Sequence, residues 1–261
     1  MKIAEFRHAF ITGGASGFGL ALAEAIHEQG VAVTIADANE EAVAAATAGK
    51  GARFRGCVLD VRDRDGWARA RAEAEAAFGP VDLLFANAGI APDGKHLSDM
   101  PPESFDRVIA INLTGVFNAI SEFGASIREQ GRGHIAMTSS MSGMVMDGPG
   151  IGSYGPSKAG VVAISEVLRM EMEPYGVGVS VLCPSYVATN LMANTISAGG
   201  SLRDPSVSLL AAEMKPPEVG ELVVRGIEAN RLYIYTHLAR LEAVEARFAG
   251  IMADGRAQAE D

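Results

Sequence analysis

Tyr154 and Lys158 have the side-chain types and spacing for acid–base chemistry. They lie four residues apart in the stretch 153–158, at the start of a predicted helix, so the two side chains share one helix face. Lowering the pKa of a tyrosine from about 10 by about 2 to 3 units takes roughly 3 to 4 kcal/mol, which Lys158 and a second cation in a partly dry cleft could supply. The pair is suited to proton transfer; the alternative is a solvated surface pair.

A glycine-rich turn, TGGASGFG from Thr12 to Gly19, follows the first predicted strand and opens a helix. In that position backbone N–H groups can approach a pyrophosphate. Gly13, Gly17 and Gly19 follow the spacing GxxxGxG, and Ser16 stands where a TGxxGxxG turn would have glycine. The turn predicts a dinucleotide site, with an ordinary tight turn as the alternative.

Two carboxylates follow the next predicted strands. Asp37 ends the second strand, where it can accept hydrogen bonds from both hydroxyls of an adenosine ribose and would repel a 2′-phosphate. Because neither Arg nor Lys stands at position 38, NAD is favoured over NADP; the alternative for Asp37 is a cap for the helix from Asn39 onward. Asp60 and Val61 are placed to meet the adenine, and Asp60 could equally cap a loop.

Polar or small residues also end the fourth and fifth predicted strands. Asn87, Ala88 and Gly89 allow close approach of a cofactor, and a hydroxyl of the pair 139–140 could hydrogen-bond a carbonyl oxygen. Asn112 lies within an apolar helical pattern, where a polar amide side chain is unexpected unless it has a structural role. Each of these motifs alone is more often structural than catalytic.

Short apolar runs alternate with helical patterns along the whole chain, which is typical of parallel βαβ construction. Near-continuous apolar runs suit strands that are covered on both faces. We therefore expect an α/β fold, a doubly wound, Rossmann-type parallel sheet of seven strands within a single domain, 1–252. The predicted strands are 8–12, 31–36, 53–58, 81–86, 133–138, 178–183 and 232–236. The predicted helices are 17–29, 40–48, 63–78, 102–130 (as two helices), 153–175, 216–229 and 238–252.

Two segments fall outside this alternation. The segment 186–214 has no clear period and is long for a plain connection, which favours a lid or substrate loop. The polar end, 253–261, is expected to be frayed.

The composition limits the classes of partner. The 261 residues carry a formal net charge of −10 and have a pI near 5.0, which argues against nucleic acids and anionic membranes. Cys57 and Cys183 lie in apolar runs and are expected to be buried thiols. His96, His134 and His237 lack metal-ligand spacing, so no metal site is predicted. Without a signal-type apolar segment, we expect a cytoplasmic protein.

The order and spacing of these motifs resemble the classical branch of the short-chain dehydrogenase/reductase family. The resemblance covers about residues 5 to 236 and rests on TGGASGFG, Asp37, NAG at 87–89, Asn112, the serine pair 139–140, YGPSK and PSYVAT at 184–189. Agreement of so many motifs by chance is remote, which makes the surface-pair interpretation of Tyr154 and Lys158 improbable.

The resemblance implies a role for each matching residue. Tyr154 would be the general acid/base, Lys158 would lower its pKa and bind the nicotinamide ribose, Ser140 would polarise the carbonyl, and Asn112 would hold a relay water. The backbone of Val187 and the side chain of Thr189 would hold the nicotinamide carboxamide. The expected cofactor-binding residues are Gly13, Ser16, Gly17, Phe18, Gly19, Asp37, Asp60, Val61, Asn87, Ala88, Gly89, Tyr154, Lys158, Pro184, Val187 and Thr189.

The chain departs from the family pattern at two places. Pro184-Ser185 replaces the usual Pro-Gly, and the interval between the serine and Tyr154 is one residue longer than is common, with 147–150 as the insertion. Ser139 and Ser142 therefore remain alternatives to Ser140.

The substrate is expected to contact Ser140, Met141, Tyr154 and Met192. Flexible thioethers such as Met141, Met144, Met146 and Met192 can line an adaptable apolar pocket, and core packing is the alternative. The stretch 232–236 and the amphipathic helix that follows it resemble the corresponding segment of family members that oxidise benzylic secondary alcohols of aryl ethers.

The resemblance also predicts the assembly and the competing functions. The helices at 102–130 and 153–175 are apolar on more than one face, as in members that pack them between subunits, so a homodimer or homotetramer is expected. The leading function is NAD-dependent interconversion of a secondary alcohol and a ketone. An NADP-linked ketoreductase of acyl chains and a dinucleotide-sensing protein without turnover are the alternatives.

Overall fold

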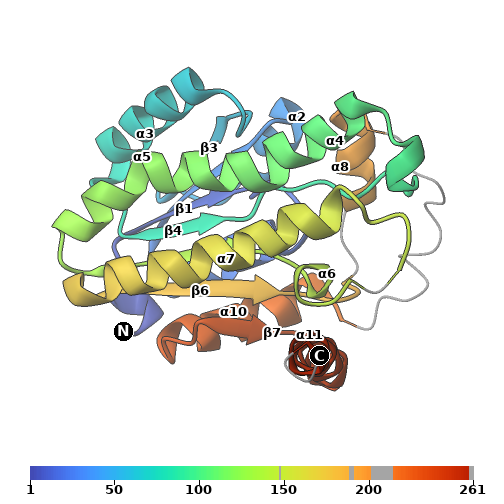
Figure 1. The fold of residues 1–261 in the computed structure, drawn as a ribbon. Helices are drawn as coiled ribbons and strands as arrows, with labels where there is room; N and C mark the ends of the chain where they lie inside the picture. The colour runs from blue at the N-terminus through green and yellow to red at the C-terminus, as the bar shows by residue number, and fades with distance from the viewer. Residues whose placement is uncertain (147, 188–190, 201–213, 259–261) are drawn as a thin grey trace.

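A seven-stranded parallel sheet forms the centre of the protein in the computed structural model, which describes residues 1–146, 148–187, 191–200 and 214–258 (Figure 1). The strand order is β3-β2-β1-β4-β5-β6-β7, so the order reverses between β1 and β4. Reversals of this kind leave a crevice outside the carboxyl ends of the strands. The strands are β1 (His8–Thr12), β2 (Ala32–Asp37), β3 (Phe54–Val58), β4 (Leu83–Ala86), β5 (Gly133–Thr138), β6 (Val177–Cys183) and β7 (Tyr233–Tyr235).

Helices cover both faces of this sheet, as the near-continuous apolar strands predict. A core cluster lies between the sheet and the helices on each face. The cluster on one face includes Trp67, Phe123 and Val161, and the cluster on the other face includes Leu22 and Val223. Every residue of β1, β5 and β6 is buried. The covering helices are α3 (Arg64–Phe78), α5 (Gly115–Glu129) and α7 (Tyr154–Met172) on one face and α1 (Gly17–Glu28), α2 (Glu40–Thr47) and α10 (Pro216–Glu228) on the other.

The predicted pair of helices at 102–130 is present, and the junction is a π-helical turn. α4 (Pro102–Ile109) passes through the π turn Ala110–Thr114 directly into α5, and Asn112 lies within that turn. π turns are wider than α-helical ones and are frequent at functional sites. The apolar pattern predicts both helices but not the geometry of the turn that joins them.

The stretch Pro102–Glu129 is also apolar and long enough to cross a membrane by length and composition alone. Half of its most apolar window is buried inside the protein, and α5 contributes Val116, Phe123 and Ile127 to the core. We therefore interpret the stretch as a core helix pair.

The segment 186–214, for which we predict a lid or substrate loop, contains a helix, α8 (Leu191–Ser197), and its residues 188–190 and 201–213 lie outside the described residues. The prediction for the end of the chain needs correction. The last helix, α11 (Leu241–Ala257), continues beyond 252, so most of the predicted tail from 253 is helical. Polar residues dominate this end because α11 has no buried residue, and polarity alone does not separate an exposed helix from a frayed tail.

Candidate active site

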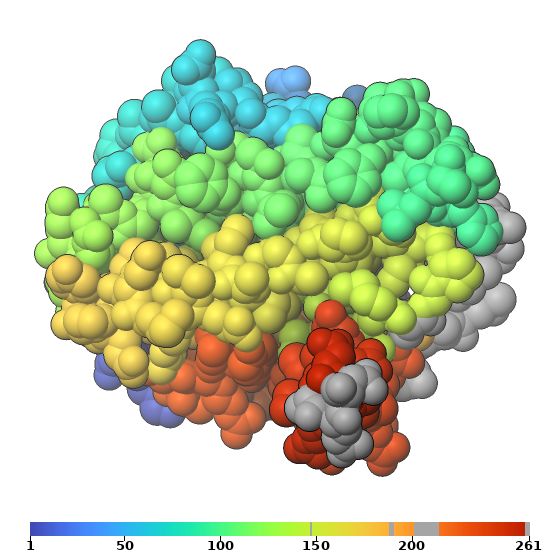
Figure 2. Space-filling model, viewed as in Figure 1, coloured from blue at the N-terminus to red at the C-terminus, as the bar shows by residue number. Residues whose placement is uncertain are grey.

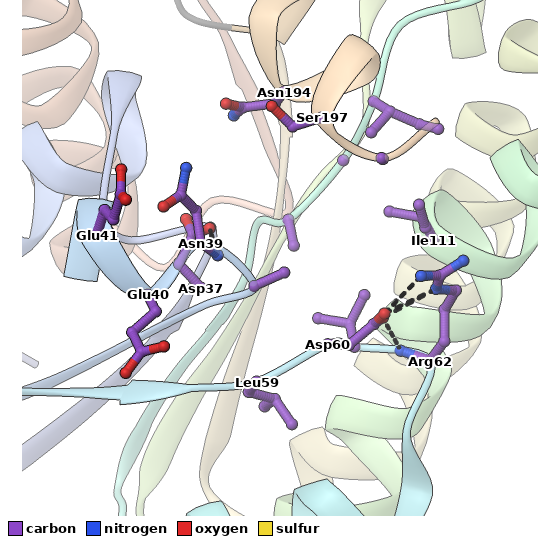
Figure 3. A pocket seen from close by; sticks show the side chains of 17 residues that line it. Asp37, Asn39, Glu40, Glu41, Leu59, Asp60, Arg62, Ile111, Asn194 and Ser197 are labelled. Atoms are coloured by element: carbon purple, nitrogen blue, oxygen red, sulfur yellow. Dashed lines mark hydrogen bonds and ion pairs between the residues drawn. The ribbon is translucent and has the colours of Figure 1, made fainter. Parts of the chain in front are cut away.

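An open cavity of about 610 Å³ lies at the carboxyl ends of the strands on the β1, β2, β3 and β4 side (Figure 3). It is bounded by the ends of β2 and β4, by the residues that follow β3 and by α8, so segments far apart in the sequence meet there. Its lining residues are Gly13, Asp37, Ala38, Asn39, Glu40, Glu41, Leu59, Asp60, Val61, Arg62, Ala88, Gly89, Ile90, Ile111, Asn194, Ser197 and Ala198.

The glycine turn has the conformation that its spacing requires. Gly13 and Gly17 have φ values of +60° and +56°, which L side chains rarely adopt, and a Cβ on Gly13 would lie 2.9 Å from the Cα atom of Ala88. α1 begins at Gly17, and Ser16 precedes it in an extended conformation. The turn, including Ser16, Phe18 and Gly19, lines a second, small cavity together with residues of α8. This places the start of α1 beside the cavity, as a phosphate site requires.

Asp37 holds the glycine turn in addition to facing the cavity. One carboxylate oxygen accepts a hydrogen bond from the N–H of Ala15 at 3.4 Å, and the other accepts one from the N–H of Asn39 at 3.1 Å. The cap of α2 is Asn39, whose side chain accepts from the N–H of Ala42 at 3.0 Å. The residue that caps α2 is therefore Asn39 and not Asp37, so the alternative role that we considered for Asp37 does not apply.

Asp60 lies at the cavity and also stabilises its own loop, so both interpretations of this residue apply. Its carboxylate accepts hydrogen bonds from the backbone N–H and the Nε atom of Arg62, each at 2.9 Å, and from Nη2 at 2.5 Å (Figure 3). These bonds from Arg62 lower the pKa of Asp60 and raise that of Arg62. Sequence reasoning missed Arg62, although its spacing of two residues from Asp60 is a signal for such a pair.

Tyr154 is the first residue of α7, and Lys158 lies one turn later with its Nζ atom 5.7 Å from the centre of the Tyr154 ring. Nζ of Lys158 donates a hydrogen bond to the carbonyl of Thr138 at the end of β5, at 2.9 Å. Burial lowers the pKa of Lys158 to about 8. Lys158 is therefore buried against the sheet and Tyr154 is half-buried, so the two residues are not a solvated surface pair.

The pKa of Tyr154 in the protein alone lies above its usual value, whereas the lowering that we predict involves a second cation. Burial raises it, and a hydrogen bond with Ser140 lowers it by less. In the protein alone, the ammonium of Lys158 donates to the carbonyl of Thr138, and desolvation is the largest influence on the pKa of Tyr154. The predicted lowering therefore requires the second cation as well as Lys158.

The structure separates the three candidate serines. The Ser139 hydroxyl is buried and donates to the carbonyl of Lys158 within α7 at 2.7 Å, which is a structural role. Ser140 is the serine that contacts Tyr154, and its hydroxyl also accepts from the N–H of Ser142 at 3.1 Å. Ser140 is therefore the serine in position to contact a substrate oxygen bound at Tyr154.

Asn112 is fully buried and binds the backbone that follows β4. Its Oδ1 accepts from the N–H of Ile90 at 2.8 Å, and its Nδ2 donates to the Ile90 carbonyl at 3.0 Å and to the hydroxyl of Ser157 at 3.4 Å. Both N–H groups of the amide are thus used within the protein. The side chain joins the π turn to the residues after β4, and a relay water would have to accept its hydrogen bonds from another donor.

Asn87 and Gly89 also have structural roles at the ends of the strands. Nδ2 of Asn87 donates to the carbonyl of Thr12 at 3.0 Å, and its Oδ1 accepts from the Thr138 hydroxyl at 3.0 Å, so the side chain joins the ends of β1, β4 and β5. A Cβ on Gly89 would lie 3.2 Å from Nζ of Lys158 and 3.3 Å from Oδ1 of Asn112. Glycine at 89 therefore allows Lys158 and the π turn to come close together.

The predicted cofactor contacts after β6 are Pro184, Val187 and Thr189. The Pro184 carbonyl accepts from the N–H of Met141 at 2.8 Å, Val187 forms a bridge to Met214, and Thr189 lies outside the described residues. The structure favours core packing for Met141, a predicted substrate contact, because it is 2% exposed and belongs to a core cluster.

The other methionines differ in whether they pack in the core or could line a substrate pocket. Met144 belongs to the same core cluster as Met141, whereas Met146 is exposed. Met192 is half-buried in α8, where it remains a candidate for substrate contact.

The cysteines and histidines have no place in this cavity. Cys183 is buried and Cys57 half-buried, and burial raises the pKa of each thiol, to about 12 and about 11 respectively. His134 is buried against the Ser180 hydroxyl at 2.8 Å, and burial lowers its pKa to about 3. Within the described ranges, no group of three or more His, Cys, Asp or Glu residues could hold a metal ion.

Comparisons with known proteins agree with this geometry. A family model described as short chain dehydrogenase matches residues 7–199. The C alpha-dehydrogenase of Sphingobium sp. strain SYK-6 is 34% identical over 97% of this chain and 87% of that protein. A 2-dehydro-3-deoxy-L-rhamnonate dehydrogenase (NAD(+)) of Sphingomonas sp. strain SKA58 is 37% identical over 69% of this chain and 71% of that protein.

Solved structures show the same relationship. The structure of a short chain dehydrogenase/reductase from Burkholderia phymatum in complex with NAD superposes with a TM-score of 0.89 at 29% identity, covering 97% of each chain. The structure of LigO from Sphingobium sp. strain SYK-6 superposes with a TM-score of 0.84 at 30% identity, covering 99% of this chain and 92% of that one. The chain therefore belongs to the short-chain dehydrogenase family of oxidoreductases.

Proposed function

We propose that this protein is an NAD-dependent dehydrogenase that interconverts a secondary alcohol and the corresponding ketone. The observation that carries the proposal is the cluster of Ser140, Tyr154 and Lys158 at the end of β5, beside a cavity edged by Asp37 and Asp60. A hydroxyl donor, a phenol and an ammonium in one partly buried site are the groups that alcohol oxidation needs. A sensing protein without turnover has no use for this combination.

Each residue of the cluster has a distinct task in the proposed reaction. The Ser140 hydroxyl donates a hydrogen bond to the substrate oxygen and so orients it beside Tyr154. Tyr154, as the phenolate, takes the hydroxyl proton of the alcohol, and in the reverse direction it returns the proton to the carbonyl oxygen. When bound, the nicotinamide ring accepts or donates the hydride.

Lys158 provides the charge that makes the phenolate accessible. With a pKa of about 8, its ammonium is the predominant form at neutral pH, and it lies close enough to the Tyr154 ring to favour the phenolate. Gly89, beside Nζ, leaves room for a ribose to approach the ammonium.

The charges around the cavity support NAD over NADP. Asp37, Glu40 and Glu41 all line it, and the one arginine among its lining residues, Arg62, is paired with Asp60 (Figure 3). A 2′-phosphate would meet three carboxylates and no unpaired cation of the lining. Titration of the enzyme with each cofactor should show NAD binding at least about 10-fold more tightly; tighter binding of NADP would instead favour the ketoreductase alternative.

The proposed substrate class is an aryl secondary alcohol of the benzylic type. The similarity of the stretch 232–236 to family members that act on such alcohols supports this class. The C alpha-dehydrogenase to which this chain is similar over nearly its whole length supports the type of reaction. A panel of aryl and alkyl secondary alcohols, followed by the absorbance of reduced nicotinamide, should show the largest kcat/KM for the aryl members. Preference for alkyl alcohols would contradict the substrate class but not the reaction.

The Tyr154→Phe variant tests the mechanism. Removing the phenolic oxygen deletes the proton acceptor and leaves the ring packing in place, so kcat should fall by about 100- to 10,000-fold while NAD binding is retained. The matched control is Tyr186→Phe, because Tyr186 is exposed and lies outside the cluster. Full activity of Tyr154→Phe on a confirmed substrate would exclude the mechanism.

We also propose that the protein is a cytoplasmic homodimer or homotetramer without nucleic-acid or membrane partners. The exposed apolar residues Phe117, Val167 and Met170 on α5 and α7 and the net charge of −10 support this proposal.

A further inference from the structure

A single-turn helix, α6 (Met141–Met144), follows Ser140 directly. Ser140 is the N-cap of this helix, and its hydroxyl accepts a hydrogen bond from the N–H of Ser142 at 3.1 Å. The same hydroxyl contacts Tyr154. The position of the Ser140 hydroxyl at Tyr154 therefore depends on where α6 lies.

Two contacts with the body of the protein hold the start and one side of α6. The N–H of Met141 donates to the carbonyl of Pro184, just after β6, at 2.8 Å. Gly143 lies on the backbone of α7, because a Cβ there would come within 2.7 Å of the carbonyl oxygen of Lys158. A helix of one turn is marginal by itself, so contacts from other elements decide its position.

α11, near the end of the chain, holds the other end of α6 (Figure 1). Nη1 of Arg247 donates to the carbonyl of Met144, the last residue of α6, at 2.8 Å. Carbonyls at the end of a helix lack a partner within it, and a hydrogen bond from a guanidinium is charge-assisted. Earlier on α11, Ala243 and Val244 pack against the core cluster to which Met144 belongs. Arg247 therefore links α11 to the turn that Ser140 caps.

We propose that Arg247 is a positioning residue for the reaction: through Met144 and α6, it holds the Ser140 hydroxyl in place at Tyr154. The alternative is that the hydrogen bond only attaches α11 to the protein. This inference rests on the proposed oxidation of a secondary alcohol, and it adds a contribution from the C-terminal helix to the placement of the substrate oxygen.

Hydrogen exchange tests the link without any substrate. The N–H of Ser142 donates to the Ser140 hydroxyl, so displacement of Ser140 should leave this N–H without its acceptor. In Arg247→Met, which removes every donor of the side chain, we expect its exchange to accelerate by about 10-fold or more. Arg247→Lys keeps a charged donor and should restore part of the protection. The matched control is Arg256→Met, at an exposed arginine of the same helix, which should exchange like the wild-type protein.

Kinetics with methyl phenyl carbinol and NAD test the consequence for the reaction. Arg247→Met should lower kcat/KM by about 10-fold and leave the affinity for NAD unchanged, since other elements line the cavity. The hydrogen bond from Ser140 lowers the pKa of Tyr154, so its weakening should move the rise of kcat/KM to higher pH. In a Ser140→Ala background, Arg247→Met should change kcat/KM by less than about twofold, because a residue that acts through Ser140 has no separate effect without it.

The outcomes distinguish positioning from simple attachment of α11. Unchanged exchange at Ser142 in folded Arg247→Met would overturn the inference and leave the proposed function standing. An equal loss of kcat/KM with and without the Ser140 hydroxyl would do the same. Should Arg247→Met not fold, Arg247→Gln, which keeps a neutral donor, takes its place with the same expectations and the same outcomes.

Failure of the proposed function has a different signature. A wild-type enzyme that oxidises no secondary alcohol with NAD would count against that function, and the positioning role would fail with it whatever the exchange at Ser142 shows.

Discussion

Lys158 is 3% exposed and is the one buried lysine of the described chain, so its charge is held at a cost to stability. Burial lowers its pKa from 10.5 to about 8. Below pH 8 the lysine is charged in the folded and the unfolded protein, and the desolvation penalty is present in full. Between about pH 8 and 10.5 the unfolded chain binds more protons, so the free energy of unfolding from this group rises with pH.

The Lys158→Met variant should therefore be more stable than the wild-type protein while being inactive. At pH 7 we expect a gain of about 1 to 3 kcal/mol in the free energy of unfolding, since the loss of the hydrogen bond to Thr138 offsets part of the relief. The gain should shrink as pH rises toward 10. Denaturant unfolding of the cofactor-free proteins at several pH values measures it, and a less stable variant at pH 7 would contradict the argument.

Two side chains of α8, Asn194 and Thr195, hydrogen-bond to residues at the carboxyl ends of the strands. The Thr195 hydroxyl is buried, accepts from the N–H of Ala91 and donates to the carbonyl of Leu191 at 2.8 Å. Asn194 reaches the hydroxyl of Ser16 at 3.4 Å. α8 therefore bridges the glycine turn and the connection after β4.

Removing the hydroxyl of Thr195 should loosen this bridge. In Thr195→Val the N–H of Ala91 loses its acceptor in a buried place, and we expect its hydrogen exchange to accelerate by about 10-fold or more. Thr195→Ser, which keeps the hydroxyl, is the matched control and should exchange like the wild-type protein. Unchanged exchange at Ala91 in the valine variant would show that other contacts hold the two segments together.

α5 and α7 lie side by side on one face of the molecule (Figure 2), and both carry exposed apolar side chains. Phe117 of α5 is 50% exposed, and Val167 and Met170 of α7 are 49% and 67% exposed. Large exposed apolar side chains on neighbouring helices are typical of an interface.

A charge on this face should weaken the proposed assembly. Phe117→Glu should reduce the mass in solution at micromolar concentration, because an unpaired carboxylate in an interface costs several kcal/mol. Light scattering measures the mass, and Val58→Glu, at an exposed apolar residue of the edge strand β3, is the control. A wild-type protein that is already monomeric would refute the assembly.

The alternation of apolar strands and amphipathic helices was sufficient to predict the sheet and its helical layers. The predictions of β1 and β5 agree with the structure at both ends, and the other strands differ by a residue or two, as is usual for boundaries. α8 was missed because a short helix between polar residues has no clear period. α11 was ended too early because an exposed helix and a frayed tail have similar compositions.

Residue types and spacing by themselves determined the family of this protein and the chemistry that we propose for it. Tyr154, Lys158, the glycine turn and Asp37 predict proton transfer next to a dinucleotide, since these functions depend on the groups present and their order along the chain. Only the tertiary structure decided which serine contacts Tyr154, that Arg62 binds Asp60, that Met141 is in the core, and which way the pKa of Tyr154 shifts. These properties depend on burial and on contacts between strand ends far apart in the chain, and local patterns contain no information about either.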